Sequence, residues 1–226
     1  MDRKNKKERN LEKRKLTGKL LMALGVLFVL GSLALQIHNV QEDRRAAAAS
    51  EAMLPDVMAA ISENIKNAAD KTRDKVGHIN PYDQAAVEAS TEMTVVVHNT
   101  WPYIGYLTMP TINMQLPVLA EWSFHNLGMA PCRHMGSTKS DDLVICAHNY
   151  PSHFGHIGEL KQGDEVSFVD MDGIRSDYRV VTVNVIDETD MDMVQDESLD
   201  LVLYTCTYSR WERVMVGCER VAPSYE

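Results

Sequence analysis

Basic residues are scarce in this 226-residue chain beyond residue 19. The first 19 residues hold nine of the 23 lysines and arginines and three acidic residues, so this head carries +6 and the remainder −15. An acidic body repels phosphate groups, and the basic stretch stops where an apolar run begins. This distribution argues against a nucleic-acid-binding protein.

Cysteine is also infrequent, and its spacing is irregular. The four cysteines are Cys132, Cys146, Cys206 and Cys218. An even number of cysteines in an exported domain would suggest disulfides. The irregular spacing argues against disulfides here, and a chain of this length can be stabilised by its own core. We therefore interpret the cysteines as small hydrophobic residues that are buried. The sequence also has no internal repeat and no low-complexity tract.

One long apolar run is present, and it contains no charge from Leu20 to Leu35. With its flanks it predicts a transmembrane segment over 20–37, because about 20 apolar residues cross a bilayer core. The basic head, 1–19, is expected in the cytoplasm and the rest of this single-pass protein outside the cell. A cleaved signal peptide and a buried soluble helix are the alternatives. The first would be shorter and closer to a small-residue cleavage site, and the second would rarely be apolar on all sides.

Residues 38–99 are expected to form a helical stalk and linker. Residues 41–60 are rich in helix-favouring residues, and Pro55 is expected to kink or restart the helix. Beyond it, apolar residues recur at helical spacing, which predicts a face packed on the body of the protein. These residues are Val57, Met58, Ile61, Ile65 and Ala68.

The pattern from residue 100 to 226 is typical of β-structure. Short segments rich in Val, Ile, Tyr and Thr alternate with turn signals and predict strands. Their ranges are about 103–109, 111–119, 142–148, 165–170, 177–186, 201–206 and 213–219. Val95 to Val97 form a further candidate strand. Many short strands without regular intervening helices indicate a barrel or a sandwich.

The segment from Asp187 to Asp200 contains seven acidic residues and no basic one. A solvated loop is the simpler interpretation. A loop that binds calcium or substrate is the alternative, since calcium takes several oxygen ligands, but the spacing fits no ligand pattern. We therefore expect no metal and no cofactor.

Three strand ends carry the residues that thiol acyl transfer requires. One strand ends at Cys206, another ends beside His148, and a third begins at Arg213. A thiolate can attack a carbonyl, an imidazole can exchange the proton, and a cation can stabilise the oxyanion and favour the thiolate. This combination predicts a cysteine enzyme with Cys206 as its nucleophile.

The sequence around these residues resembles the sortases, which are membrane-anchored cysteine transpeptidases of Gram-positive bacteria. Their Thr-Leu-x-Thr-Cys signature reads Val-Leu-Tyr-Thr-Cys at 202–206, and their Ala-Gly-His reads Cys-Ala-His at 146–148. Their arginine opens the strand after the cysteine loop, as Arg213 does here; Arg210, inside the loop, is a second candidate. The resemblance covers about residues 100–222 and is weaker between Leu116 and Asp141.

This resemblance implies an eight-stranded β-barrel with short helices, preceded by the transmembrane helix. Cys206 would be the nucleophile, His148 the general acid/base and Arg213 the oxyanion or substrate ligand; Thr205 and Asn149 are expected to bind substrate. The thiolate would cleave a Leu-Pro-x-Thr-Gly-like C-terminal sorting signal of a surface protein. An amine of peptidoglycan or of a pilin would then resolve the thioester. The sequence has no Asp-Pro-aromatic lid and is more similar to class B.

Other interpretations stay open. His148, His153 and His156 are zinc-type ligands, but their spacing matches no standard site. A thiol hydrolase or protease would use the same Cys206, His148 and Arg213 with water as the acceptor. A surface-adhesion module that kept the fold without activity is a third alternative. The strand period places Cys146 on the same face as His148, so it could lie beneath the active site; it is instead interpreted as a small core residue, at a position where the sortases often have alanine.

Overall fold

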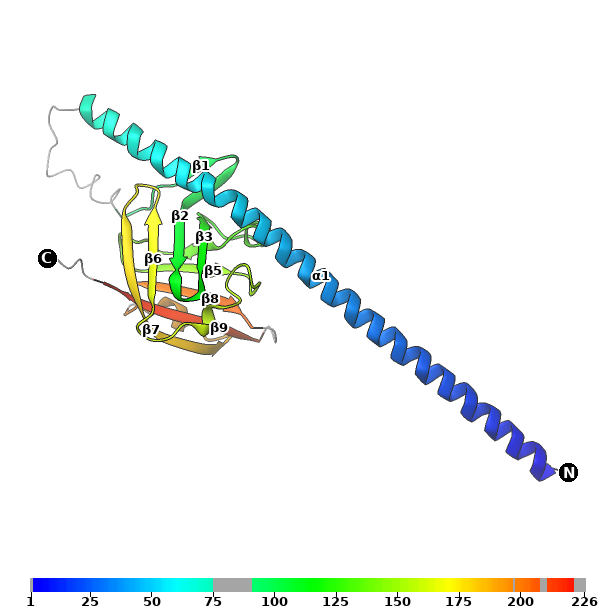
Figure 1. Ribbon diagram of the computed structural model, residues 1–226. Helices are drawn as coiled ribbons and strands as arrows, with labels where there is room; N and C mark the ends of the chain where they lie inside the picture. The colour runs from blue at the N-terminus through cyan, green and yellow to red at the C-terminus, as the bar shows by residue number, and fades with distance from the viewer. Residues whose placement is uncertain (1, 75–90, 197, 208–210, 222–226) are drawn as a thin grey trace. The chain divides into compact units, whose positions relative to one another are not determined.

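A closed β-barrel forms the body of the protein in the computed structural model, which describes residues 2–74, 91–196, 198–207 and 211–221 (Figure 1). Its eight strands neighbour one another in the order β2, β3, β4, β5, β8, β9, β7 and β6, and β6 pairs with β2 to close the barrel. A ninth strand, β1 (Val96–His98), pairs only with β2. The strands are β2 Trp101–Met109, β3 Met114–Leu119, β4 Cys132–Met135, β5 Leu143–Ala147, β6 Glu165–Asp170, β7 Arg175–Asp187, β8 Leu201–Cys206 and β9 Glu212–Arg220. The expectation of a mostly β, eight-stranded barrel is confirmed.

Side chains alternate between the inside and the outside of the barrel, as the two-residue period of a strand requires. In β8, Leu201 and Leu203 belong to the interior core, whereas Val202 packs in a separate cluster outside. In β5, Ile145 faces the interior and Cys146 the exterior. Every second residue of these strands therefore points out of the barrel, where other segments cover Cys146 and Val202.

The structure differs from the expected strand pattern in its short helices and in one additional strand. Residues 110–112 form the 3-10 helix η1 (Pro110–Ile112), which ends at Asn113 with a φ of 49°, so β3 begins later than predicted. The strand β4 was missed, because Cys-Arg-His-Met shows no alternation of apolar and polar residues. The other short helices are α3 Phe124–Leu127, η2 Ile157–Glu159 and η3 Met191–Gln195.

A single helix, α1 (Asp2–Asp74), precedes the barrel, and the chain divides within it into two compact units, 1–42 and 43–226. In the first unit the apolar residues of 20–37 are exposed. By length and composition α1 is the one helix among the described residues that could cross a membrane, with a mean hydropathy of 2.4 over its most apolar window. This is consistent with the expected anchor.

In the second unit, one face of α1 packs on the outside of the barrel. The buried residues of that face recur every three or four positions: Ala46, Ser50, Met53, Val57, Ala60 and Ile61. They contact an outer cluster that includes Tyr103, Leu119 and Met171. The predicted face is confirmed at Val57 and Ile61, and Ile65 lies next to Gly173 of the barrel although it is partly exposed. Met58 is exposed, the side chain of Ala68 lies outside the described residues, and the buried face begins earlier than predicted, at Ala46.

The helix continues through Pro55 without a break, whereas the sequence predicted a kink or a restart there. Proline removes one helical hydrogen bond. Because Met53 and Val57 on either side are buried against the barrel, their packing offsets that loss.

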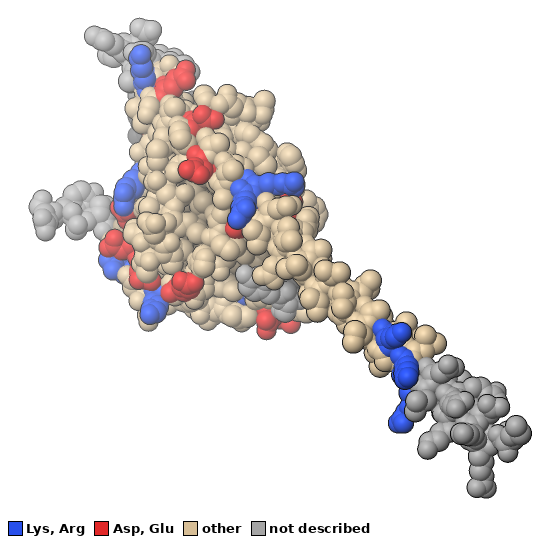
Figure 2. Space-filling model, turned by 45° about the vertical axis from the view of Figure 1, so that its right-hand side comes forward, with Lys and Arg blue, Asp and Glu red and all other residues tan. Residues whose placement is uncertain are grey.

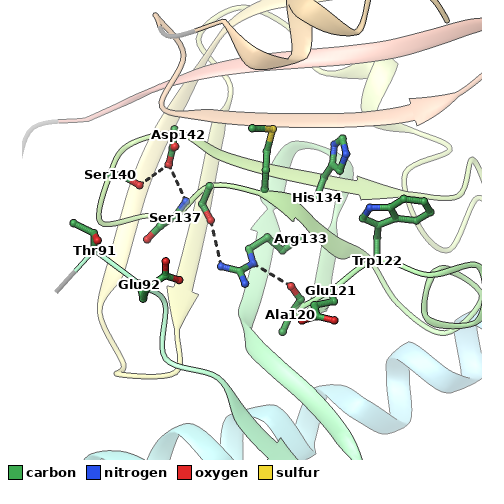
Figure 3. A pocket seen from close by; sticks show the side chains of 12 residues that line it. Thr91, Glu92, Ala120, Glu121, Trp122, Arg133, His134, Ser137, Ser140 and Asp142 are labelled. Carbon is green, nitrogen blue, oxygen red and sulfur yellow. Dashed lines mark hydrogen bonds between the residues drawn. The ribbon is translucent and has the colours of Figure 1, made fainter. Parts of the chain in front are cut away.

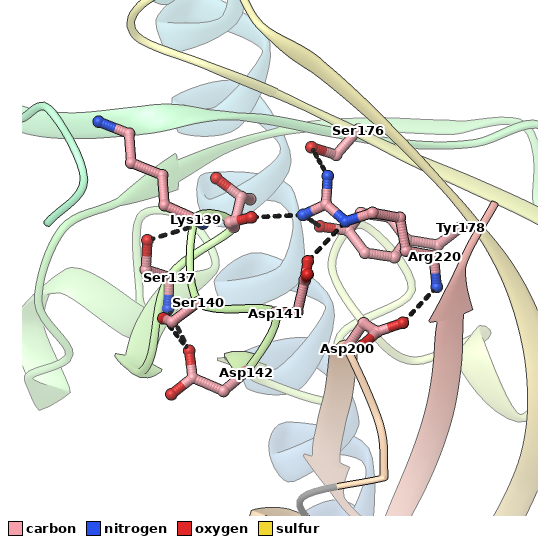
Figure 4. A network of polar contacts seen from close by, with 10 residues as sticks. Ser137, Lys139, Ser140, Asp141, Asp142, Ser176, Tyr178, Asp200 and Arg220 are labelled. Atoms are coloured by element: carbon pink, nitrogen blue, oxygen red, sulfur yellow. Dashed lines mark hydrogen bonds and ion pairs between the residues drawn. The ribbon is translucent and has the colours of Figure 1, made fainter. Parts of the chain in front are cut away.

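At the end of β9, Arg220 joins three segments of the barrel (Figure 4). Its guanidinium group donates hydrogen bonds to Asp141, to Ser176 and to the carbonyl of Thr138, and its backbone N–H donates to Asp200. On the face seen in Figure 2, acidic and basic side chains are interspersed over the body. That face offers no continuous basic surface for nucleic acid.

Candidate active site

The strands β5 and β8 run parallel, and this brings their C-terminal ends together. Their register pairs Leu143 with Leu201 and continues to Ala147 with Thr205. His148 and Cys206 are the next residues of the two segments. Paired positions of parallel strands place their side chains on one face. His148 and Cys206 therefore follow Cys146 and Tyr204 on the outside of the barrel.

The two strand ends are joined by a buried hydrogen bond immediately before these residues. The Thr205 hydroxyl donates to the carbonyl oxygen of Ala147 at 2.8 Å, and Thr205 is only 3% exposed. This burial does not favour the expected substrate contact through the Thr205 side chain. The hydroxyl instead fixes the spacing between the strand that carries Cys206 and the one that precedes His148.

Arg213 lies directly opposite Cys206 on the antiparallel neighbour β9. Its guanidinium group donates to the carbonyl of Glu212 at 3.1 Å and lies 3.9 Å from the carboxylate of Glu188. Its side chain is 19% exposed, so it is partly buried at this strand end. Arg210, the second candidate, lies outside the described residues.

The other three cysteines are buried, whereas Cys206 is partly exposed. Burial raises the pKa of Cys146 to about 11 and that of Cys218 to about 12, and it raises the pKa of Cys132 as well. A raised pKa suppresses the reactive thiolate. Accessibility therefore separates Cys206 from the other three thiols, whose burial suppresses the thiolate.

His148 is partly buried, and this burial lowers its pKa. The neutral imidazole is therefore favoured at neutral pH, which is the form that can accept a proton. Its ring packs 4.9 Å from that of Tyr150. Asn149 follows directly and is partly exposed; its expected contact with substrate stays a prediction.

The described residues do not support the alternative metal sites. The Nε2 atom of His153 is buried and lies 3.0 Å from the hydroxyl of Ser50, and His156 pairs with Glu159. No group of three histidine, cysteine or acidic residues within the described ranges could hold a metal ion. In the acidic segment, Asp187 and Asp196 accept hydrogen bonds from Thr189 and Ser198, which is typical of turns.

A hollow of about 780 Å³ lies along β4 and the residues that precede β5 (Figure 3). Trp122 and His134 line one part of it and Asp142 another, with Arg133 between them. The Tyr204 hydroxyl lies 3.1 Å from Nδ1 of His134, so Tyr204 connects the hollow to the strand end at Cys206. Sequence reasoning missed these residues, although strand alternation places Tyr204 on the face of Cys206.

Comparison with known proteins gives one consistent result. A family model described as a sortase domain matches residues 107–221. No curated protein matches the chain. Among solved structures, sortase C1 from Streptococcus agalactiae is similar with a TM-score of 0.52 and 20% identity, over 78% of this chain and all of that one. Sortase C-1 from Actinomyces oris is similar with a TM-score of 0.51 and 19% identity, over 72% of this chain and 98% of that one.

Proposed function

Because the chain belongs to the sortase family, we propose that it is a cysteine transpeptidase with Cys206 as nucleophile, His148 as general acid/base and Arg213 as oxyanion ligand. One observation supports the proposal: Cys206 pairs with Arg213 across β8 and β9, and the pairing of β5 with β8 ends at Ala147 and Thr205, one residue before His148 and Cys206. The resemblance to class B stays a prediction.

In this proposal each residue takes part in a defined step. His148 accepts the proton of the Cys206 thiol, the resulting thiolate attacks the scissile carbonyl carbon, and the guanidinium group of Arg213 stabilises the negative charge that develops on the oxygen. When the C–N bond breaks, His148 donates a proton to the leaving amine and a thioester remains on Cys206. A second amine then attacks the thioester, His148 accepts its proton, and the thiolate leaves as the new amide forms.

We propose a C-terminal sorting signal of the Leu-Pro-x-Thr-Gly type as the substrate, cleaved after the threonine. The acceptor is an amine of peptidoglycan or of a pilin subunit. The domain plan follows from this role: a cytoplasmic head at 1–19, an anchor at 20–37, a stalk and linker at 38–99, and a catalytic domain at 100–226 outside the cell membrane.

Mass spectrometry of the full-length chain in detergent micelles tests this proposal. Incubation with a library of sorting peptides should add an acyl group to Cys206, and an added amine should release a transpeptidation product. Cys206→Ala, His148→Ala and Arg213→Ala should each abolish turnover with the fold retained. Cys146→Ala is the matched thiol control and should stay active.

Continued transpeptidation by Cys206→Ala would contradict the assignment. Release of free acid alone, with every amine tried, would identify a thiol hydrolase instead. A wild-type chain that no peptide acylates would favour the adhesion module. Because Cys206 is the exposed thiol, brief treatment with iodoacetamide should label it before the other three cysteines.

A further inference from the structure

The loop that follows His148 is held by α1 at two points. The backbone N–H of Ser152 donates to Oδ1 of Asp43 at 3.0 Å, and the Ser152 hydroxyl donates to the backbone carbonyl of Asp43. About two turns further along α1, the Ser50 hydroxyl lies 3.0 Å from Nε2 of His153. Both contacts lie within the compact unit 43–226.

The same loop is tied back to His148. The N–H of Phe154 donates to the carbonyl of His148 at 3.1 Å, and the N–H groups of His153 and Gly155 both donate to the carbonyl of Tyr150. The side chain of Phe154 is buried in the barrel core. A displacement of residues 152–154 would therefore be transmitted to the backbone at His148 rather than absorbed within the loop.

The contact at Ser50 has a defined direction. The Ser50 hydroxyl donates its single hydrogen to the carbonyl of Met129 at 2.9 Å, so Nε2 of His153 carries the hydrogen that joins it to Ser50. His153 is fully buried, and its Nδ1 has no hydrogen-bond partner among the described residues. Its ring packs on Tyr150, whose ring packs in turn on His148. Ser50 thus fixes the orientation of a ring that lies one side chain away from His148.

We propose that Asp43 and Ser50 of α1 are positioning residues, which hold the 149–156 loop so that His148 stays in place beside Cys206. This proposal rests on the function proposed above for His148 and Cys206. Neither residue touches the reacting atoms; both act through Ser152 and His153. The segment of α1 from Asp43 to Pro55 then belongs to the catalytic unit as well as to the stalk.

Steady-state kinetics of the full-length chain in detergent micelles distinguish this positioning role from a role that only holds α1 on the barrel. Asp43→Ala and Ser50→Ala should lower kcat by about ten- to a hundredfold with little change in KM, the loss that a displacement of about 1 Å causes at a catalytic group. Asp43→Asn keeps an oxygen acceptor for the Ser152 N–H and should restore kcat.

Asn64→Ala is the matched control. Asn64 also joins α1 to the barrel, through a hydrogen bond to the carbonyl of Met171 at 2.9 Å, but it has no bond to the 149–156 loop among the described contacts. It should lower the melting temperature without lowering kcat. Hydrogen exchange of the 149–156 backbone should rise in Asp43→Ala and not in Asn64→Ala, a readout that needs no substrate.

The outcomes distinguish the two proposals. Wild-type kcat in Asp43→Ala and Ser50→Ala, or an equal loss in Asn64→Ala, overturns the positioning role even if Cys206→Ala is inactive. Unchanged hydrogen exchange in Asp43→Ala also overturns it. Activity in Cys206→Ala would instead overturn the proposed function, whatever the α1 variants do.

Discussion

Burial of His153 makes the stability of the barrel depend on pH. Burial, together with the nearby His148, lowers the pKa of His153 to about 4, while a histidine in the unfolded chain keeps a pKa near 6.5. Between these values the unfolded state binds more protons than the folded state. Stability therefore falls as the pH is lowered from 6.5, and this contribution levels off below pH 4.

The size of the effect follows from the difference between the two pKa values. At about 1.4 kcal/mol per pKa unit, a single group contributes about 3 kcal/mol over this window. Glutamine is the useful replacement, because its Nε2 can donate to Ser50 as the imidazole does but does not titrate. The curve of unfolding free energy against pH should therefore be flatter in His153→Gln by about 3 kcal/mol between pH 6.5 and 4.

Urea denaturation of the full-length chain in detergent micelles measures this difference. Tryptophan fluorescence reports on the barrel unit, since Trp101, Trp122 and Trp211 all lie within it. Most carboxylates contribute equally to both proteins and cancel in the comparison. Parallel curves for the wild type and His153→Gln would refute the reasoning, because they would mean that His153 titrates alike in the folded and unfolded states.

Substitutions at four further positions test the barrel. Thr205→Val removes the buried hydrogen bond between β5 and β8 and should destabilise the barrel by about 1 kcal/mol. The melting temperature should fall by a few degrees, and an unchanged melting temperature would show that this hydrogen bond does not contribute to stability. Gly105→Ala should prevent folding or destabilise by several kcal/mol, because a Cβ there would lie 2.0 Å from a backbone oxygen at a φ of +147°. Gly163→Ala, where φ is +94° and the space is open, should be tolerated far better, and circular dichroism would rank the two. Arg220→Lys should destabilise nearly as much as Arg220→Ala, because an ammonium group cannot reproduce the forked set of hydrogen bonds; full stability in Arg220→Lys would contradict this.

The sequence predicted the barrel and its main strands because strand alternation and turn residues are local signals. Cys206 and Arg213 could be chosen for similar reasons, since each lies at the end of an apolar strand. The strand β4 could not be found, since its four residues are held by their neighbours rather than by their own pattern.

Contacts between residues far apart in the sequence could not be predicted from local sequence patterns. Nothing near Ser50 in the sequence indicates that its hydroxyl meets His153, because that contact arises from the packing of α1 on the barrel. For the same reason the buried face of α1 was predicted from Val57 onward, although it begins at Ala46. Small residues such as alanine and serine give a weak periodic signal, yet they allow the helix to approach the barrel closely.

The parallel pairing of β5 and β8 has a consequence for how the protein acquires its reactivity. Two strands with two long connections separate β5 from β8 along the chain, so their ends meet only after a large loop has closed, which is entropically costly and slow. While the strands are still unpaired, the chain carries the thiol of Cys206 without Arg213 opposite it and without the end of β5 beside it. Under the proposed function, the nucleophile would therefore become reactive only as the barrel is completed, and a partly folded chain would be protected from premature acylation.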